Sequence, residues 1–593
     1  MAENGNEKYK DLSRENLLKV IEKLEARKKY GLIWDEEKVK EQFEKDAVNA
    51  LPILKEIKGK EIETNPDEPI NILIEGDNYH ALSVLNFTHQ GKIDVIYIDP
   101  PYNTGNRTWK YNNDYIERED DYRHSKWLSF MSKRLRLAKN LLKDDGIIIV
   151  TIDDYEIYQL GMLMNEIFGE ENRLANITVL NKKSGRTTDK FFATCHEYYL
   201  VYAKNSSLAN IGMFTLNEEQ AAEYKLEDKI SAYKWRDFLR TGGFSTPKER
   251  PNSYYPIYFD EKKNKISIEK ISNSVEIWPI DSKENKRVWR QTRPSLENLV
   301  KIGDIKIEKN KNGKYNVRIK DRVKTGIKPK TVWDNPRYDA ATHGTKLLEQ
   351  IYGEAKVFDF PKSIFAVLDA LKITVANKKD AIILDFFAGS GTTGHAVLEM
   401  NKEDNGIRQF ILCTNNEING LEKELREKGM SEKEIQEHGI CQRITYPRVE
   451  KVIKGYKNSK GEKIEGLGSN LKYFKTGFVK KTVNSDDMKI KLTRECTEML
   501  CIREGVFDEN KKTDDYAIFE QNGHIMAVYY SIERKGLKEL KKELDKLKGE
   551  KVLYCFTLDP LGLNKSDFTN WKDTQLEPIP QKILEVYEEI YEY

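Results

Sequence analysis

The sequence predicts an α/β protein whose main domain is an open, mostly parallel β-sheet covered by helices. Near-continuous apolar runs such as KIDVIYID (92–99) are typical of strands buried on both faces of a parallel sheet. These runs alternate with segments of helical periodicity, and strand, helix and strand over some thirty residues make a βαβ unit. The chain has 593 residues, more than one hydrophobic core usually supports, so two to four domains are expected.

The chain is expected to divide into five segments, with the boundaries 1–70, 71–204, 205–336, 337–445 and 446–593. The first is a helical lead-in, because apolar residues recur there at helical spacing, as at Leu17, Leu18, Ile21 and Leu24. The second and fourth are two parts of the α/β domain. The third is an inserted, strand-rich domain, because its short apolar runs are separated by Asn, Gly, Lys and Pro. The last is a small α+β C-terminal domain.

The individual elements follow from the apolar runs and from the breaks between them. Asp145-Gly146, for example, ends a helix before the strand that begins at Ile147. Asn522-Gly523 between two apolar runs predicts a β-hairpin. In chain order we expect strand 71–76, helix 78–88, strand 92–99, helix 125–142, strand 147–150, helix 155–168, strand 198–202, helix 363–371, strand 381–384, helix 392–400, strand 409–412, hairpin strands 516–519 and 525–528, helix 537–547 and strand 551–556.

Charge and cysteine content narrow the classes of function. The net charge is +2, so a nucleic-acid surface must be a local patch. We expect one at 301–330, which holds eleven Lys and Arg against three Asp and Glu; a solvated hairpin face is the alternative. The six cysteines form no C-x-x-C pair, which argues against a zinc site or a disulfide framework. No run approaches the roughly 18 apolar residues of a membrane span. The charged N-terminus lacks the core of a secretion signal, so we expect a cytoplasmic protein.

The tetrapeptide Asp99-Pro100-Pro101-Tyr102 directly follows a strand predicted to be buried. Ligands of open parallel sheets bind beyond the carboxyl ends of the strands, so this loop should stand at a site. Its prolines make it stiff and leave carbonyl acceptors without competing donors. Asp99 and the Pro100 carbonyl could hold both hydrogens of an aromatic amino group and aim its lone pair outward, while Tyr102 stacks on the ring. A nucleic-acid base with such an amino group, such as adenine, cannot be reached inside a duplex and must be flipped out.

A second motif, LDFFAGSGTTG (384–394), stands between a predicted strand and a predicted helix. Gly389, Gly391 and Gly394 fit G-x-G-x-x-G, and Glu417 follows 23 residues later, where a carboxylate can hold ribose hydroxyls. No Gly-Lys-Ser/Thr follows, so the motif does not fit an NTP-binding loop. The carboxylates of Asp385 and Glu417 suit a positively charged sulfonium cofactor. Taken alone, the motif also fits a nicotinamide-dependent oxidoreductase.

In both motifs and in their order, the sequence resembles an amino-methyltransferase of the β class. It resembles more closely the modification (Mod) subunit of type III restriction–modification systems. The resemblance covers most of the chain, through 73–78, 97–105, 122–128, 152–154, 196–198, 360–363, the glycine motif and, more weakly, 468–471. Glu197 stands where many relatives carry Asp, a departure that leaves the fold unaffected. The resemblance implies a Rossmann-like methyltransferase domain that uses S-adenosylmethionine, with 205–336 as the target recognition domain. It also implies a homodimer and a restriction–helicase (Res) partner.

The resemblance further implies roles for individual residues. Asp99, Pro100, Pro101 and Tyr102 would form the catalytic loop. Phe387, Gly389 and Gly391 would line the methionine and ribose portion of the cofactor, with Asp385 beside them, and Glu417 would hold the ribose. Asp77 would contact the adenine amine of the cofactor, and Lys362 would lie near its carboxylate.

The expected reaction is therefore sequence-specific methylation of N6 of a flipped adenine in double-stranded DNA. N4 of cytosine is the alternative, because the same loop could serve it. If the protein were an oxidoreductase, the Asp99–Tyr102 loop would have no function and the basic insertion would remain unexplained. Methyl transfer from a sulfonium needs no metal, and the sequence shows no cluster of His and Cys residues that could bind one. Among the remaining candidates, we interpret His124 and His196 as structural, Cys195 and Cys413 as packing residues, and Asp153-Asp154 as either a helix cap or the rim of the cleft.

Overall fold

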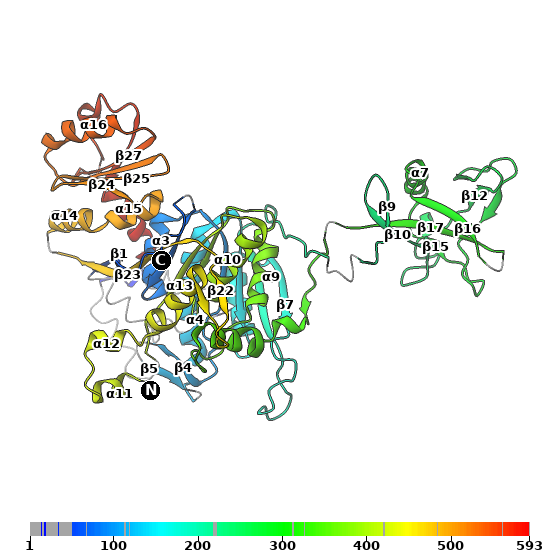
Figure 1. Ribbon diagram of the computed structural model, residues 1–593, viewed down its shortest axis with the longest axis horizontal. Coiled ribbons are helices and arrows are strands. Elements are labelled where there is room, and N and C mark those ends of the chain that lie inside the picture. Colours follow the sequence, from blue (N-terminus) through cyan, green and yellow to red (C-terminus); the bar gives the residue numbers. More distant parts are fainter. Residues whose placement is uncertain are drawn as a thin grey trace. The chain divides into compact units, whose positions relative to one another are not determined.

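The computed structural model describes residues 50–591, apart from 67, 112–113, 118, 217–221, 311–312, 325, 419–420, 483 and 560. It also describes six residues nearer the N-terminus: 13, 14, 17, 18, 32 and 34. The chain forms two compact units (Figure 1). We call 1–212 with 330–593 the sheet unit, and 213–329 the inserted unit. Among the described residues, no helix has the length and apolar character needed to cross a membrane.

A ten-stranded β-sheet forms the centre of the sheet unit. Its strands are β1 (Ala50–Glu56), β2 (Ile70–Glu75), β3 (Ile93–Ile98), β6 (Leu142–Ile152), β7 (Arg173–Val179), β8 (Glu197–Ala203), β18 (Val332–Trp333), β19 (Ile382–Asp385), β20 (Gln409–Thr414) and β23 (Asn470–Lys480). They lie in the order β1-β23-β2-β20-β19-β3-β6-β8-β7-β18. Within this sheet β1 and β8 run opposite to the other eight strands. The predicted α/β fold with a mostly parallel, Rossmann-like sheet is confirmed.

Helices from two stretches of the chain cover the sheet. They are α3 (Asn78–Thr88), α4 (Arg123–Leu141) and α5 (Ile157–Phe168), and then α9 (Ile364–Val375), α10 (Thr392–Asp404) and α13 (Tyr446–Lys454). In the first group α4 packs between α3 and α5, and in the second α10 packs against α9 and α13. The chain crosses the sheet in one direction from β2 through β3 to β6, and in the opposite direction from β19 to β20. Because such crossovers are right-handed, the two groups cover opposite faces.

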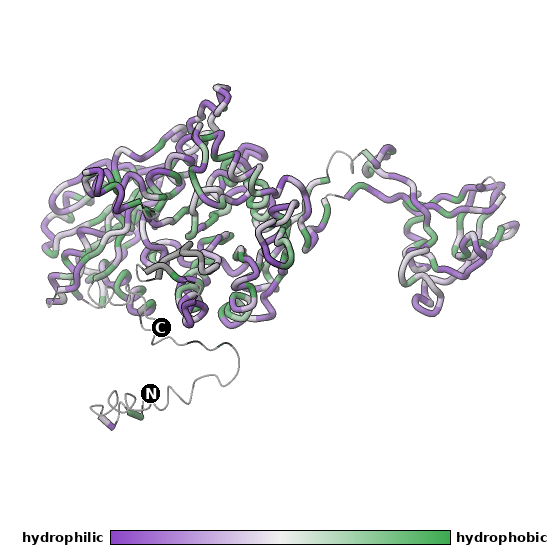
Figure 2. Tube along the Cα trace, turned by 90° about the horizontal axis from the view of Figure 1, so that it is seen from below, coloured by the Kyte–Doolittle hydropathy of each residue, from purple (hydrophilic) through white to green (hydrophobic). Residues whose placement is uncertain are grey.

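The burial of the central strands explains their apolar sequences. All six residues of β3 are buried, as are all residues from 146 to 152 of β6. A strand covered on both faces has no solvent-facing positions, so its sequence does not alternate. Figure 2 colours the described trace by hydropathy and shows hydrophobic stretches alternating with hydrophilic ones.

Two predicted boundaries of the sheet unit are wrong. Ala50–Glu56, assigned to the helical lead-in, form β1, which pairs antiparallel with β23; most of 1–49 lies outside the described residues. Residues 446–480, assigned to the C-terminal domain, contribute helix α13, which packs against α10, and strand β23, which lies between β1 and β2 in the ten-stranded sheet. Strand pairing over some 400 residues leaves no local signal, so periodicity alone could not place these segments.

The C-terminal segment adds a second, five-stranded sheet in the order β24-β25-β26-β27-β28. Its elements are β24 (Glu509–Lys512), β25 (Tyr516–Gln521), β26 (His524–Tyr529), α16 (Leu537–Lys546), β27 (Glu550–Phe556), β28 (Thr574–Ile579) and α17 (Gln581–Tyr591). The predicted hairpin is confirmed: β25 and β26 pair antiparallel, and Asn522 and Gly523 both have positive φ, 51° and 77°. Two positive φ angles in a two-residue loop match the twist of the strands.

The inserted unit has its own hydrophobic core. Its larger sheet has the order β16-β17-β10-β9, with β9 (Leu226–Glu227), β10 (Ala232–Asp237), β16 (Ile305–Lys309) and β17 (Tyr315–Arg322). Helix α7 (Arg293–Lys301) packs against β16. The unit is strand-rich but shorter than the predicted 205–336. The flanking residues belong to the sheet unit, where Val332 and Trp333 form β18 beside β7.

Candidate active site

The two sequence motifs stand at the carboxyl ends of neighbouring parallel strands. β3 leads into 99–102, here called the Asp99 loop, and β19 leads into 385–394, here called the glycine turn. In the register of these strands Leu384 lies opposite Ile96, so both segments leave the same edge of the sheet. The charge of Asp99 also reaches Asp385, where it adds to burial in raising the pKa. The structure therefore brings the two motifs together across a chain separation of nearly 300 residues.

Lys362 contacts the Asp99 loop through its ammonium group. Its Nζ lies 3.0 Å from Asp99 Oδ1 and 2.9 Å from Glu197 Oε2, and it also donates to the Tyr102 hydroxyl. These acceptors use all three ammonium hydrogens. Burial by itself would lower the pKa of Lys362, but attraction to Asp99 and Glu197 outweighs it and the pKa is raised. The lysine is therefore charged and held by the Asp99 loop and not by the glycine turn.

The carboxylate of Asp99 is anchored through one oxygen only. Thr151 Oγ1 donates to Oδ1 at 2.5 Å, and Lys362 approaches the same atom. Among the described residues no donor reaches Oδ2, and the side chain is 28% exposed. One oxygen thus fixes the orientation of the carboxylate while the other can accept a hydrogen bond from a ligand.

Tyr102 is held by its hydroxyl, which donates to Glu197 Oε2 at 3.0 Å and lies 3.3 Å from Thr151 Oγ1. Burial, with the nearby charges of Asp99 and Glu197, raises its pKa well above the usual range, so the phenol stays protonated. Anchoring at the hydroxyl fixes the plane of the partly exposed ring. Such a ring is preorganised to stack on a planar ligand.

Hydrogen bonds from buried side chains fix the backbone of the Asp99 loop. The indole of the fully buried Trp127 donates to the Pro101 carbonyl at 2.7 Å. Asn103, whose φ is +55°, donates from its amide to Glu156 Oε1 at 2.5 Å. Within the described residues no donor engages the Pro100 carbonyl, so that acceptor remains for a ligand next to Asp99 Oδ2.

Asp385 organises the glycine turn. Its carboxylate accepts from the Phe387 N–H at 3.0 Å and from Thr393 Oγ1 at 2.5 Å. Burial raises its pKa to about 7, although these hydrogen bonds oppose the shift. Among the described residues no cation pairs with it. A buried carboxylate with no positive partner fits a cationic ligand at the turn.

The turn needs glycine at two positions. Gly389 and Gly391 have φ of +48° and +77°, which side chains rarely adopt. The Gly389 carbonyl accepts from Thr445 Oγ1 at 2.6 Å. Behind it the fully buried Arg448 donates to Thr392 Oγ1 at 2.8 Å and to Ser390 Oγ at 3.0 Å. Burial lowers the pKa of Arg448 to about 10.

The other predicted cofactor residues stand around the same edge. Asp77 caps α3 by accepting from the Tyr79 N–H at 2.8 Å. Burial and then the charges of Asp77 and Asp385 raise the pKa of Cys413 far above its usual range, so both carboxylates lie near one buried thiol. Phe387 contacts Phe130, with ring centroids 5.8 Å apart. Glu417 follows β20 by three residues, half-buried. The cofactor roles of these residues stay predictions.

Several site residues escaped the sequence reasoning, namely Glu197, Thr151, Trp127, Glu156, Thr445 and Arg448. Glu197, Thr151 and Trp127 belong to or adjoin segments of the resemblance, which was the one signal available for them. His124 Nδ1 lies 2.6 Å from Glu156 Oε1, and His196 Nε2 lies 2.9 Å from the Tyr198 hydroxyl. Both histidines therefore have structural partners. Asp153 accepts from the Tyr155 N–H at 3.0 Å just before α5, and burial raises its pKa to about 6.

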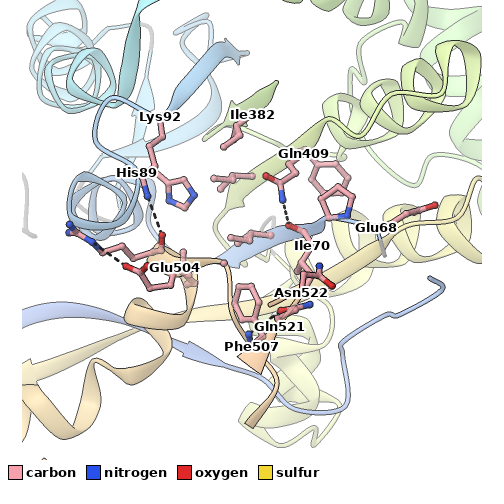
Figure 3. A pocket seen from close by; sticks show the side chains of 17 residues that line it. Glu68, Ile70, His89, Lys92, Ile382, Gln409, Glu504, Phe507, Gln521 and Asn522 are labelled. Carbon is pink, nitrogen blue, oxygen red and sulfur yellow. Dashed lines mark hydrogen bonds and ion pairs between the residues drawn. The ribbon is translucent and has the colours of Figure 1, made fainter. Parts of the chain in front are cut away.

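A separate cavity of about 340 Å³ lies at the opposite edge of the sheet (Figure 3). Ile70, Ile382 and Gln409, the first residues of β2, β19 and β20, line it together with Phe507 and Gln521. It therefore stands at the amino ends of the strands, where open α/β sheets do not bind their principal ligands.

The inserted unit concentrates positive charge, but not in the predicted way. It holds 26 Lys and Arg against 17 Asp and Glu. Within 301–330, most described basic residues form ion pairs with acids of the same unit, as Arg322 does with Asp228 and Asp304. The predicted patch at 301–330 is thus largely neutralised locally, and the excess charge belongs to the unit as a whole.

Comparison with known proteins identifies the family. Residues 93–425, more than half of the chain, match the DNA methylase family N6_N4_Mtase. The chain is 33% identical over 447 residues to the type III restriction–modification enzyme EcoPI Mod subunit of Escherichia phage P1, covering 68% of this chain and 67% of that one. It is 36% identical over 346 residues to the type II methyltransferase M.KpnI of Klebsiella pneumoniae, covering 58% and 79%. In the crystal structure of the M1.HpyAVI–SAM complex, 98% of that chain aligns with 64% of this one at 13% identity and a TM-score of 0.27. The family match over 93–425 leaves the oxidoreductase alternative without support. This chain belongs to the DNA methylase family.

Proposed function

We propose that the protein transfers a methyl group from S-adenosylmethionine to N6 of adenine within a specific DNA sequence. The observation that carries the proposal is the meeting of the Asp99 loop and the glycine turn at the ends of β3 and β19. One segment offers acceptors for an amino group and the other a buried carboxylate for a cation. Membership of the DNA methylase family agrees with both roles, since a methylase must bind an amino substrate and a cationic methyl donor.

The residues of the Asp99 loop would activate the amino group by position. Its nitrogen lone pair is delocalised into the ring, so the free base is a poor nucleophile. Asp99 Oδ2 and the Pro100 carbonyl, which lack donors among the described residues, would accept the two amino hydrogens. Tyr102 would stack on the base, worth about 1–3 kcal/mol. Acceptors that are already oriented need no reorganisation during the reaction.

The residues of the glycine turn fit the cofactor. S-adenosylmethionine supplies an electrophilic methyl group carried on a sulfonium cation. Asp385 would offset that charge, while Gly389 and Gly391 let the nucleoside approach the backbone beside Phe387. Asp77 and Glu417 would contact the adenine amine and the ribose. Lys362, which was expected near the cofactor carboxylate, would instead hold Asp99 and Tyr102 in place.

Adenine is favoured over cytosine as the target base. The similarity to Mod subunits such as EcoPI and StyLTI, at 33% and 32% identity, supports N6 of adenine. The acceptor geometry by itself would serve either amino group. The base would be flipped out of the duplex, because its amino group is otherwise out of reach of the Asp99 loop.

The same similarity supports a place in a type III restriction–modification system. The chain would act there as the modification and specificity subunit, as a cytoplasmic homodimer that partners a Res subunit. The inserted unit would be the target recognition domain, and its excess of positive charge suits contacts with DNA phosphates.

A labelling experiment tests the reaction. The protein is incubated with DNA and S-adenosylmethionine carrying a labelled methyl group, and the DNA is digested to nucleosides. Label is expected in N6-methyladenine and not in N4-methylcytosine. Asp99→Ala should abolish transfer while cofactor binding, measured by calorimetry, survives. Unchanged transfer by this variant would refute the assigned role of the loop. Expression in a host without methyltransferases, followed by mapping of modified bases, identifies the DNA site.

A further inference from the structure

The connection between β7 and β8 carries two phenylalanines that nothing in the described chain covers. We call residues 180–196 the β7–β8 loop. The side chains of Phe191 and Phe192 are 83% and 91% exposed, among the most exposed large apolar residues described. Two consecutive phenylalanine side chains exposed to water are unfavourable, so they point to a partner that buries them.

The loop starts and ends at the active-site edge of the sheet. β8 runs opposite to β6, and Tyr198 lies across from Ile152, the last residue of β6. Val179 at the end of β7 pairs with Glu197 at the start of β8. The residue that follows the loop is therefore Glu197, which binds Tyr102 and Lys362. Arg186 of the loop lies close enough to Asp153 for its charge to oppose the rise in pKa that burial causes there.

The loop is internally braced by hydrogen bonds. Lys182 N–H donates to the Cys195 carbonyl at 3.1 Å, and Arg186 N–H donates to the Thr194 carbonyl at 2.9 Å. The Asp189 carboxylate accepts from the Thr194 N–H at 2.8 Å. Figure 1 shows the loop, coloured between cyan and green, projecting from the sheet unit below the label of β7. A braced loop can present side chains at its tip without losing further conformational freedom on binding.

The charge of the loop suits DNA. It carries four basic residues, Lys182, Lys183, Arg186 and Lys190, against the single acid Asp189. In the described part of the chain, none of the four forms an ion pair with a carboxylate. Unpaired basic side chains around an apolar tip match a phosphate backbone that flanks stacked bases.

We propose that the Phe191–Phe192 pair is a wedge that enters the base stack of the target duplex next to the flipped adenine. This proposal rests on the proposed function. Extruding a base costs the free energy of its lost stacking and pairing. An apolar ring that occupies the vacated space restores part of that stacking, and it buries a surface that is otherwise exposed to water. Lys182, Lys183, Arg186 and Lys190 would hold the adjoining phosphates.

The test uses the full chain and a duplex that carries its mapped methylation site. The variants are Phe191→Ala, Phe192→Ala and both together. Leu561→Ala, which truncates an apolar side chain that is 94% exposed elsewhere, is the matched control. Methyl transfer is measured as kcat/KM, and flipping is measured by the fluorescence of 2-aminopurine placed at the target adenine. We expect the double variant to lose on the order of tenfold or more in kcat/KM, with a weaker fluorescence increase at saturating protein.

A weakened duplex separates a wedge from a merely structural loop. If the target adenine stands in a mismatch, extrusion costs less, and the double variant should recover most of its activity relative to wild type. Lys182→Gln with Lys190→Gln should instead weaken binding on both duplexes and reduce its salt dependence.

Each outcome decides the proposal. If wild type methylates the duplex and the double variant does so equally, the wedge is wrong, and the phenylalanines then serve another partner such as a protein. If the loss persists on the mismatched duplex, the loop is structural and the wedge is again wrong. If wild type methylates no DNA at all, the proposed function fails and the wedge fails with it.

Discussion

The Asp99 loop and the glycine turn lie side by side but are held by different forces. Opposite charges hold the Asp99 loop, because one lysine joins two carboxylates and a phenol. Backbone conformation and hydrogen bonds hold the glycine turn, with Gly389 and Gly391 at positive φ and Thr445 and Arg448 behind them. Charges can be rearranged when a ligand arrives, whereas a backbone shape is permanent. The difference suits one segment that activates a substrate and another that receives a cofactor by shape.

Removing the charge of Lys362 should have the largest effect on stability. Lys362→Met leaves Asp99 and Glu197 as neighbouring carboxylates without a cation, which costs about 3 kcal/mol. Repulsion between them favours protonation, so the loss should shrink as pH falls from 8 to 5.5. Urea unfolding at both pH values measures it. Lys372→Met, which breaks an exposed pair with Glu403, should cost less than about 1 kcal/mol. An equal loss at both pH values would contradict the electrostatic account.

A side chain in the glycine turn should impair cofactor binding more than stability. Gly391→Ala forces alanine to a φ of +77° and costs about 1 kcal/mol of unfolding free energy. Gly429→Ala meets the same penalty at a φ of +78°, with open space around its Cβ and no place in the site. Calorimetry should find S-adenosylmethionine binding weakened about tenfold or more by Gly391→Ala alone. Equal binding by both variants would show that the turn does not shape the cofactor site.

The pH dependence of cofactor binding should report on Asp385. Burial raises its pKa to about 7, so a cation beside it favours the ionised form and binding releases a proton. Affinity for S-adenosylmethionine should therefore rise several-fold between pH 6 and pH 8. S-adenosylhomocysteine has the same amino acid portion but no sulfonium, so its affinity should change less. If the affinities for the two ligands changed equally with pH, Asp385 would not be the residue that contacts the sulfonium.

The smallest effect on methylation is expected from Glu156→Gln, because Glu156 lies behind the Asp99 loop and binds Asn103, the residue after it. Burial raises its pKa to about 8, so the carboxyl is mostly neutral at pH 7. Because the pKa is about 4.5 in the unfolded chain, the stability that the protonated carboxyl contributes is lost as pH rises from about 4.5 to about 8. Glu156→Gln should keep methylation at pH 7 within about twofold and flatten the stability profile from about pH 5 to 8. Glu156→Ala, which leaves Asn103 and His124 without an acceptor, should cost about 1–3 kcal/mol. A large loss of activity in the Gln variant would mean that Glu156 works as an anion.

Much of the α/β core could be predicted because its signals are local. The apolar run of β3 and the helical spacing of α3 stand in consecutive residues, and α3 begins and ends where the sequence indicated. β7 was missed, because its exposed and half-buried positions interrupt the apolar pattern. β1 and β23 were misassigned, because each is recognised only through its partner. In 301–330 the charge count was right, but several of the acids that offset it, such as Asp228 and Glu261, come from elsewhere in the inserted unit.

The sequence by itself determined the two motifs, their order and the strands that carry them, since each depends on residues close along the chain. Only the tertiary structure decided that β3 and β19 are neighbours, that Lys362 faces Asp99, and that Glu197 completes the network around Tyr102. These contacts join residues about 100 to 290 positions apart. Their geometry follows from the packing of the whole sheet, which no local pattern records.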